Sequence, residues 1–260
     1  MDLHWHCHEL FHGMPQGAVA GGIVVVIDVL RASTTIATAL AHGAAGVRAV
    51  PTVDEARRAA AAMGGSALLG GERGGVRIEG FALGNSPLEY TRDRVAGRSL
   101  VVTTTNGTAA LDACRGAREI VIGALVNRAA VARAVRRLAV EDGIRDVHLV
   151  CAGTDGAVTA EDVLAAGAIL DAAAAKGAAD TLDAPARRAR DAYRRVVAAA
   201  EPRAALAAEF RRSSGGANLV SLGMEADLPV CAALDAITVV PRLDRATGWL
   251  TEMVPATKSG

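Results

Sequence analysis

The most regular apolar stretch of the chain is Ile23–Ile27, which consists entirely of β-branched residues. Such a run predicts a strand that is buried on both faces. Asp28 follows this strand, and Ser33 and Thr34 are suited to cap a helix that runs to residue 40. Ligands of open α/β sheets bind outside the carboxyl ends of strands, and a helix N-terminus favours an anion. The loop therefore offers Asp28 for a cation or a nucleophilic role and Arg31 for an anionic oxygen. The alternative is that Asp28 only caps the helix and Arg31 is solvated.

The same succession of strand, polar turn and helix recurs later in the chain. The pattern predicts a strand over 99–102, a polar turn over 103–108 and a helix after it. Hydroxyl and unpaired N–H groups in this turn suit a tetrahedral oxyanion, although the spacing and the lysine of a nucleotide-binding P-loop are absent. Because a helix cap needs only one polar residue, we favour an anion site over a purely structural turn. The predicted ligand-binding residues of the turn are Thr104, Thr105, Asn106, Gly107 and Thr108.

Two further polar segments lie between these units. Glu72 and Arg73 stand among four glycines in the segment 70–75, which we expect to be a loop that turns sharply, approaches a ligand or is simply flexible. The segment Ser86–Glu89 has the spacing of a capping box, which predicts the start of a short helix. Asn85 precedes it and is expected either to form a left-handed turn or to contact a ligand.

Strands and helices alternate through the rest of the chain, which is typical of an α/β fold. Further strands are predicted at 47–50, 67–69, 119–123, 146–151 and 237–241. Helices are predicted at 54–63, 127–141 with Asn127 as its cap, 160–176, and 183–212 with an interruption near Pro202. We expect a loop at 213–216 and frayed residues from 256 to 260.

Two adjacent acids, Glu161 and Asp162, open the helix at 160–176. With Thr159 as the cap, one interpretation is that they only complement the helix dipole. The other is that they bind a hard cation beside an oxyanion pocket, because Mg²⁺ prefers carboxylate oxygens and retains water.

The amino-terminal segment holds four of the six histidines. In a strand, His4, His6 and His8 would share one face, which is a geometry that a metal site requires. We favour the alternative, a half-exposed edge strand, and assign no role to His12.

Composition limits the classes of partner. The 260 residues have a formal net charge of zero and are 51% hydrophobic, which indicates a globular chain with no general affinity for nucleic acid or membranes. Cys7, Cys114, Cys151 and Cys231 are far apart and are expected to be reduced core residues. Since the sequence shows no secretory signal and no apolar run long enough for a membrane span, we expect a cytoplasmic protein.

Six segments together resemble the 2-phosphosulfolactate phosphatase family, in the family's order and over most of the chain. They are Asp28–Thr35, Leu69–Arg73, Gly80–Pro87, Thr103–Thr108, Cys151–Thr154, and Glu161-Asp162 followed by Ala166-Gly167. The carboxyl-terminal part fits through Gly223, Asp227, Cys231, Asp235 and Val240-Pro241. The histidine-rich segment is not a signature of this family.

The resemblance implies a single domain over 1–260 with a three-layer α/β/α fold and a mixed, largely parallel sheet. It also implies a Mg²⁺-dependent hydrolysis of 2-phospho-3-sulfolactate to 3-sulfolactate and phosphate, a step of coenzyme M biosynthesis. On this basis the expected catalytic residues are Asp28, Arg31, Glu72 and Arg73. Ser33, Thr34, Asn85, Ser86 and Thr104–Thr108 are expected to bind substrate. Asp28, Glu72, Glu161 and Asp162 are expected to bind the metal.

Three functional hypotheses stay open at this point. The first is the phosphatase just described, with a small anionic substrate. The second is a phosphatase for another small phosphorylated carboxylic acid, and the third is an anion-binding module without turnover. Clustered carboxylates argue against the third, because they would weaken pure anion binding. Asp28 is more readily a metal ligand than a nucleophile, since the second aspartate that commonly accompanies such a nucleophile is replaced by Leu30. The oligomeric state is open, a homo-oligomer included.

Overall fold

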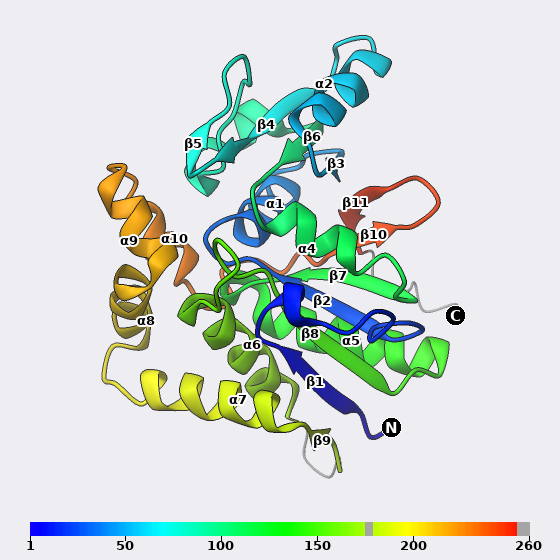
Figure 1. Ribbon diagram of the computed structural model, residues 1–260, viewed down its shortest axis with the longest axis vertical. Coiled ribbons are helices and arrows are strands. Elements are labelled where there is room, and N and C mark those ends of the chain that lie inside the picture. Colours follow the sequence, from blue (N-terminus) through cyan, green and yellow to red (C-terminus); the bar gives the residue numbers. More distant parts are fainter. Residues whose placement is uncertain (175–178, 254–260) are drawn as a thin grey trace.

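The computed structural model describes residues 1–174 and 179–253. Its strands are β1 His4–His8, β2 Ile23–Ile27, β3 Gly46–Ala49, β4 Leu68–Arg73, β5 Val76–Arg77, β6 Ser99–Thr103, β7 Glu119–Gly123, β8 Asp146–Cys151, β9 Thr181–Leu182, β10 Pro241–Asp244 and β11 Trp249–Glu252. Within the described residues they form one sheet in the order β5-β4-β6-β3-β11-β10-β7-β2-β8-β1-β9 (Figure 1).

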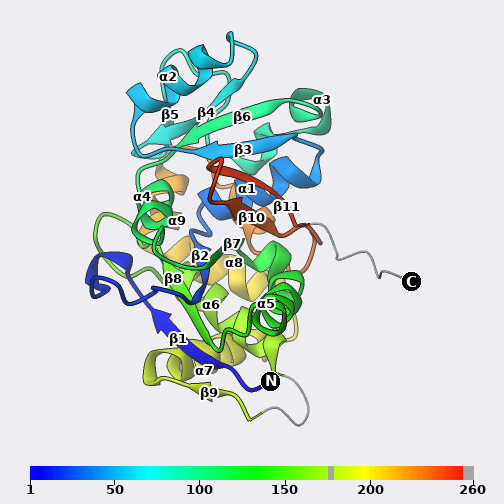
Figure 2. The same cartoon turned by 90° about the vertical axis from the view of Figure 1, so that its right-hand side faces the viewer.

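The sheet is mixed, as predicted. β2 lies between β7 and β8 and is parallel to both, with Val25 opposite Val121 and Leu149. The antiparallel pair β10–β11 joins this part of the sheet to the parallel strands β3, β6 and β4 (Figure 2). Because three antiparallel pairings separate the two groups, β3, β6 and β4 run in the opposite direction to β7, β2 and β8 along the sheet.

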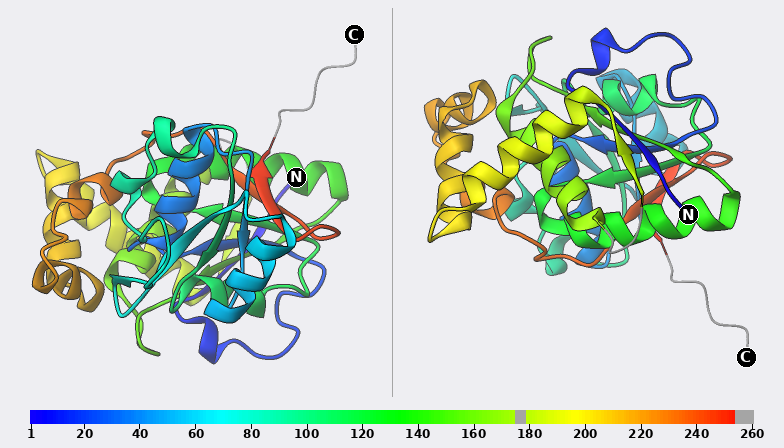
Figure 3. Two further views of the ribbon diagram at one scale, coloured as in Figure 1. Left: turned by 90° about the horizontal axis from the view of Figure 1, so that it is seen from above. Right: turned by 90° about the horizontal axis from the view of Figure 1, so that it is seen from below.

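Helices cover both faces of the sheet. The α-helices are α1 Ala32–Ala41, α2 Val53–Ala62, α3 Arg92–Val95, α4 Gly107–Ala113, α5 Arg128–Asp142, α6 Ala160–Ala173, α7 Ala184–Val197, α8 Pro202–Arg212, α9 Ser214–Ser221 and α10 Asp227–Cys231. Short 3₁₀ helices are η1 Phe11–Gly13, η2 Pro87–Glu89 and η3 Leu125–Asn127. Helices α8, α9 and α10 project from one side of the sheet (Figure 3).

The residues of β2 explain the layering. Ile23, Val25 and Ile27 belong to an apolar cluster that includes residues of α5 and α6. Val24 and Val26 belong to a second cluster with residues of α1 and α4. Because successive side chains of a strand point to opposite faces, a run without polar residues can fill both layers. The predicted three-layer α/β/α fold is confirmed, and the single domain over 1–260 stays a prediction.

Several expected boundaries are wrong near the carboxyl ends of strands. α1 begins at Ala32, so Ser33 and Thr34 lie inside its first turn and do not cap it. The expected loop 70–75 is mostly strand, because Gly70 and Gly71 pair with β6 and extend β4 to Arg73. Only the tight turn at 74–75 separates β4 from β5.

Caps also differ from the predictions. Asn127 and Thr159 occupy the cap positions of α5 and α6, but neither side chain makes a capping hydrogen bond. Ser86 caps η2 through Leu88 N, whereas Glu89 accepts from Gly84 N, so the reciprocal half of the capping box is not formed. The Glu89 carboxylate thus binds the backbone amide of Gly84, in the preceding loop, in place of the amide of the helix cap.

The carboxyl-terminal third departs most from the prediction. The expected loop at 213–216 is the start of α9, which Ser213 caps through Gly216 N. The expected strand at 237–241 is irregular up to residue 240, and β10 and β11 follow it. α6 ends at Ala173, and the expected helix end at 176 and the frayed segment 256–260 lie outside the described residues.

Two predictions from composition can be compared directly with the structure. The four cysteines are free and buried, which confirms their expected core role. Among the described helices, none combines the length and the apolar character needed to cross a membrane. A cytoplasmic location stays a prediction.

Candidate active site

A pocket lies at the edge of the sheet where the parallel strands end. Six of the predicted site residues line it: Asp28, Arg31, Glu72, Asn85, Thr105 and Asn106. They come from the loop after β2, the end of β4, the segment before η2 and the loop after β6. Residues far apart in the sequence meet here, and they come from both parallel groups of strands, which run in opposite directions along the sheet.

Asp28 is buried at the base of this pocket. Its Oδ1 accepts a hydrogen bond from Ala32 N at 3.2 Å, so it does contact the start of α1, and its own N–H donates to Ser33 Oγ at 2.9 Å. Burial raises the pKa of Asp28 to about 7, and the charges of Glu72 and Glu161 act in the same direction. A Cβ at Gly107 would lie 2.5 Å from Asp28 Oδ2, so Gly107 acts by leaving space for this carboxylate.

Glu161 and Asp162 lie behind the pocket and are also buried. Asp162 accepts from Val29 N at 2.8 Å and from Gly153 N at 2.9 Å, so it ties the loop after β2 to the loop after β8. Burial raises the pKa of both carboxyls, and the charges of Asp28 and Glu161 add to the effect on Asp162.

One oxygen of this acidic pair lacks a partner. Glu161 Oε2 is buried and makes no hydrogen bond of ordinary geometry within the described part of the chain. Its other oxygen, Oε1, would lie 2.5 Å from a Cβ at Gly215, a residue that lines the pocket. A buried carboxylate oxygen without a donor is costly unless a cation or a proton satisfies it.

Glu72 has a different environment. Its Oε1 accepts from Thr105 N at 2.7 Å and its Oε2 from Gly75 N at 2.6 Å, with a longer contact of 3.2 Å from Thr105 Oγ1. These bonds hold the tight turn after β4 against the loop after β6. Glu72 is therefore occupied by protein donors, including a backbone amide that was expected to bind an anion.

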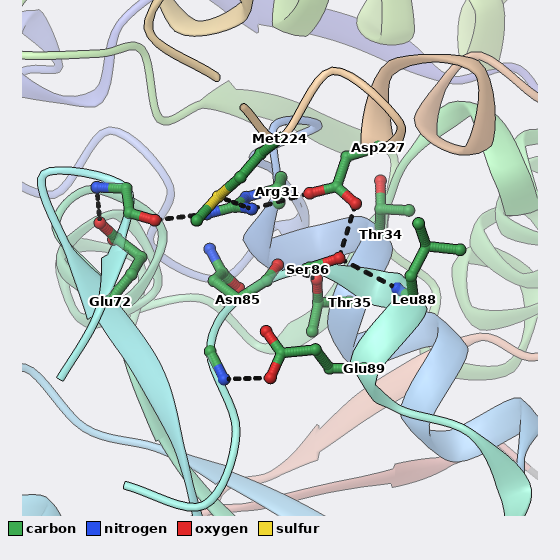
Figure 4. A network of polar contacts seen from close by, with 12 residues as sticks. Arg31, Thr34, Thr35, Glu72, Asn85, Ser86, Leu88, Glu89, Met224 and Asp227 are labelled. Carbon is green, nitrogen blue, oxygen red and sulfur yellow. Dashed lines mark hydrogen bonds and ion pairs between the residues drawn. The ribbon is translucent and has the colours of Figure 1, made fainter. Parts of the chain in front are cut away.

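Arg31 is held in the pocket wall by three partners (Figure 4). One nitrogen, NH1, donates to Asp227 Oδ2 at 2.7 Å and to Met224 Sδ at 3.0 Å, and NH2 donates to Gly75 O at 2.9 Å. The side chains of Arg31 and Asp227 are only 2% and 3% exposed, so this ion pair is buried. Arg31 is the only cationic residue among the described residues that line the pocket.

Other predicted residues lie near the pocket but do not line it. The Arg73 guanidinium donates to the carbonyls of Glu72 and Pro51 and to Thr103 Oγ1, so it braces strand ends. Ser33 and Thr34 donate to carbonyls of β2 and of the loop after it. Thr104 and Thr108 bond to each other across the first turn of α4. Ser86 donates to Asp227 Oδ1 at 2.6 Å.

The sequence is similar to those of known proteins over most of its length. Residues 10–246 match the family model described as 2-phosphosulpholactate phosphatase. The chain belongs to this family. It is 43% identical over 228 residues to a "Probable 2-phosphosulfolactate phosphatase" of Symbiobacterium thermophilum, with 87% of this chain and 93% of the relative covered.

Two further relatives carry the same description. One, from Deinococcus radiodurans, is 44% identical over 85% of this chain and 87% of its own length. The other, from Thermotoga petrophila, is 37% identical over 88% of this chain and 92% of its own length. The predicted family and the predicted class, a phosphoric monoester hydrolase, are thereby confirmed.

Some pocket residues were not singled out in the sequence. Thr154 and Asp155 follow β8, and Asn218 and Leu219 come from α9. The motif Cys151–Thr154 pointed to the first pair, because it lies at the end of a predicted strand. No local signal pointed to Asn218, since its neighbourhood was expected to follow a loop and its role depends on how α9 packs.

The four predicted metal ligands differ in how their carboxylate oxygens are engaged. In the residues that the structure describes, no three histidine, cysteine, aspartate or glutamate side chains converge as a metal site. Of the four predicted carboxylates, Asp162 and Glu72 have both oxygens engaged by backbone N–H groups, whereas Glu161 has a free oxygen. Mg²⁺ commonly takes only one or two carboxylates and keeps several waters. The Mg²⁺ ligand set stays a prediction.

The histidine-rich strand β1 lies away from this pocket. His4 Nδ1 and His6 Nε2 contact Asp146 Oδ1 at 3.2 and 3.4 Å, and the rings of His6 and His8 stack on His148. β1 is not an edge strand, because it pairs with both β8 and β9. The expectation of an edge strand is therefore wrong.

Proposed function

We propose that this protein hydrolyses 2-phospho-3-sulfolactate to 3-sulfolactate and phosphate, with Mg²⁺ as its cofactor. The observation that carries this proposal is the acidic pocket at the sheet edge of a member of this phosphatase family. Asp28, Glu72 and Asp155 line it together with Arg31, the one cationic residue among the described lining residues. A substrate with phosphate, sulfonate and carboxylate groups would be repelled there unless a cation is bound as well.

The donor set fits a hard divalent cation. Asp28 and Glu161 offer buried carboxylate oxygens. The charge of Glu161 raises the pKa of Asp28, and both charges raise the pKa of Asp162. Glu161 Oε2 lacks a hydrogen-bond partner in the described residues. A bound cation reverses this balance, because it stabilises the ionised carboxylates. We infer that Asp28 and Glu161 hold Mg²⁺, while Asp162 and Glu72 fix the surrounding loops. When bound, Mg²⁺ would neutralise the phosphoryl oxygens and act as a Lewis acid.

The remaining groups of the pocket position the substrate. Arg31 has five N–H groups, and its contacts in the described structure use three of them, which leaves two for an oxyanion. Asn85, Asn106 and Asn218 add neutral amide groups to the wall. Because these donors are held before the reaction, they can stabilise developing charge without reorganisation.

The reaction would be a step of the type used in coenzyme M biosynthesis. Such a small anionic substrate is consistent with a pocket that is lined by six segments of the chain. We place the reaction in the cytoplasm and assign no role to nucleic acid or membranes, in keeping with the balanced charge of the sequence.

The test is phosphate release from 2-phospho-3-sulfolactate across a Mg²⁺ titration. We expect no turnover after chelation and recovery when Mg²⁺ is restored. Full activity of a metal-stripped preparation would exclude the metal role. A panel of other phosphorylated carboxylic acids separates the main alternative, and tight binding of phosphosulfolactate without phosphate release would indicate a binding module.

A further inference from the structure

We propose that Asp227 is a positioning residue for the reaction, which holds Arg31 in its working orientation from the far end of the chain. This inference rests on the proposed function. Asp227 opens α10 and lies 196 positions from Arg31 in the sequence. It was identified in the sequence only as part of a family pattern, and it is not among the described residues that line the pocket.

The first argument is the geometry of the ion pair. Asp227 Oδ2 lies 2.7 Å from Arg31 NH1, and Asp227 Oδ1 accepts from Ser86 Oγ at 2.6 Å. The carboxylate thus binds Arg31 with one oxygen and is itself held by the other (Figure 4). A carboxylate fixed in this way restricts the guanidinium far more than a solvated one.

The second argument is where Arg31 would go without Asp227. Arg31 is 2% exposed and has acidic neighbours in the pocket, since its charge acts on Asp28. A buried cation that loses its counter-ion seeks another one, at considerable cost in free energy. A guanidinium released from Asp227 would be free to pair with Asp28, on which its charge already acts, and would then occupy the proposed metal ligand as well. Asp227 therefore keeps the two pocket residues apart.

The third argument is that Asp227 completes a continuous chain of contacts around the pocket. Arg31 also donates to Gly75 O, and Gly75 N donates to Glu72, which accepts from Thr105 N. This series fixes segments from five parts of the chain relative to one another. Asp227 and Ser86 extend this series beyond Arg31.

The experiment compares Asp227→Asn, Arg31→Lys and the double variant in phosphate release and in equilibrium binding of inorganic phosphate with Mg²⁺ present. We expect Asp227→Asn to lower kcat/KM by about 10- to 100-fold. The double variant should be little worse than Arg31→Lys alone, because both changes disable the same guanidinium. Fully additive losses would overturn the proposal.

The matched control is Glu119→Gln. Glu119 pairs with Arg242 through contacts of 2.7 and 2.8 Å beside a groove at the opposite end of β7, far from the predicted site residues. We expect it to lower the unfolding temperature less than Asp227→Asn does, because Arg242 is 42% exposed, and to leave kcat/KM unchanged. An equal kinetic loss in this control would show that Asp227→Asn acts through general stability, and would refute a positioning role.

A milder variant covers the case in which Asp227→Asn does not fold. Ser86→Ala keeps the ion pair and removes the 2.6 Å hydrogen bond to Asp227, so we expect a loss of a few-fold in kcat/KM. Unchanged kinetics would overturn the proposal. If the unaltered protein releases no phosphate from phosphosulfolactate, the proposed function fails, and weaker phosphate binding in these variants would still support the positioning role. Equal phosphate binding in all of them would contradict it.

Discussion

Two clusters of ionisable side chains lie on the same sheet, and they differ in how their charges are satisfied. Around Asp28, buried carboxylates share one arginine, and burial raises the pKa of Asp28 to about 7. Around His148, on β8, the rings of His6 and His8 stack on a third imidazole, and Asp146 and Asp183 supply the opposite charge. Among the described residues, the first cluster has more buried carboxylates than cations, whereas the second has a carboxylate beside its imidazoles.

This difference shows why the density of ligand-type residues is a poor guide to a site. The histidine cluster looks richer in the sequence, yet its members contact one another or Asp146. The carboxylate cluster is assembled from distant segments and retains an unsatisfied oxygen in the described residues. A buried polar atom without a hydrogen-bond partner indicates a ligand site better than a local concentration of ligand-type residues does.

The largest effect expected is for Asp28→Asn, which keeps the shape of the side chain and removes its charge. If Asp28 binds Mg²⁺, turnover should fall about a hundredfold or more and high Mg²⁺ should restore part of it. Phosphate release across a Mg²⁺ titration measures this, with circular dichroism as the folding control. A complete loss that no Mg²⁺ concentration relieves would favour a nucleophilic role for Asp28.

The next largest effect concerns Arg31→Lys, which keeps the charge and loses the planar fork. Because Arg31 is held by three partners and offers two further N–H groups, the loss should be on the order of 2 kcal/mol, or about 30-fold in kcat/KM. Mg²⁺ affinity should change little, in contrast to Asp28→Asn. Near-normal kinetics in both variants would show that the loop after β2 is not the active site.

A third prediction concerns how the stability of the folded protein depends on pH through the histidine cluster. Burial lowers the pKa of His148 from 6.5 to about 4, and the charges of His6 and His8 act in the same direction, whereas Asp146 and Asp183 oppose it. The unfolded chain takes up a proton as the pH falls below 6.5, while the folded chain resists it until about pH 4. Stability should therefore drop by on the order of 2 kcal/mol across this window.

Urea unfolding at a series of pH values measures this effect. His148→Gln should flatten the decrease between pH 6.5 and 4, because the titrating ring is removed. The exposed His12→Gln is the matched control and should retain the decrease. An acid profile that His148→Gln leaves unchanged would assign the sensitivity to other groups.

The smallest effect is expected when His4, His6 and His8 are all replaced by glutamine. Turnover should stay within a few-fold of the original, a change of under about 1 kcal/mol, since these residues lie away from the pocket. Steady-state kinetics together with thermal unfolding measure this. A loss of activity in a folded variant would place a functional metal site on β1 and reverse the comparison.

The sequence by itself determined the elements whose signals are local. Three strands have the expected bounds: Ile23–Ile27, Glu119–Gly123 and Asp146–Cys151. Their apolar runs predict burial on both faces of a strand without any information about distant residues. The resemblance to the phosphatase family placed Asp28, Arg31, Asn85, Thr105 and Asn106 in one site, and all five line the pocket.

Only the tertiary structure decided what these residues do there. Glu72 was expected to bind a metal and Thr105 an anion, yet they bind each other across 33 positions of sequence. Ser86 was expected to bind substrate, and it holds Asp227 instead. A hydrogen-bonding group takes whichever partner the fold brings within about 3 Å, and sequence spacing carries no information about such distant partners. The sequence motifs thus predicted which segments form the site. Contacts between distant segments determine which of its polar groups remain available to a ligand.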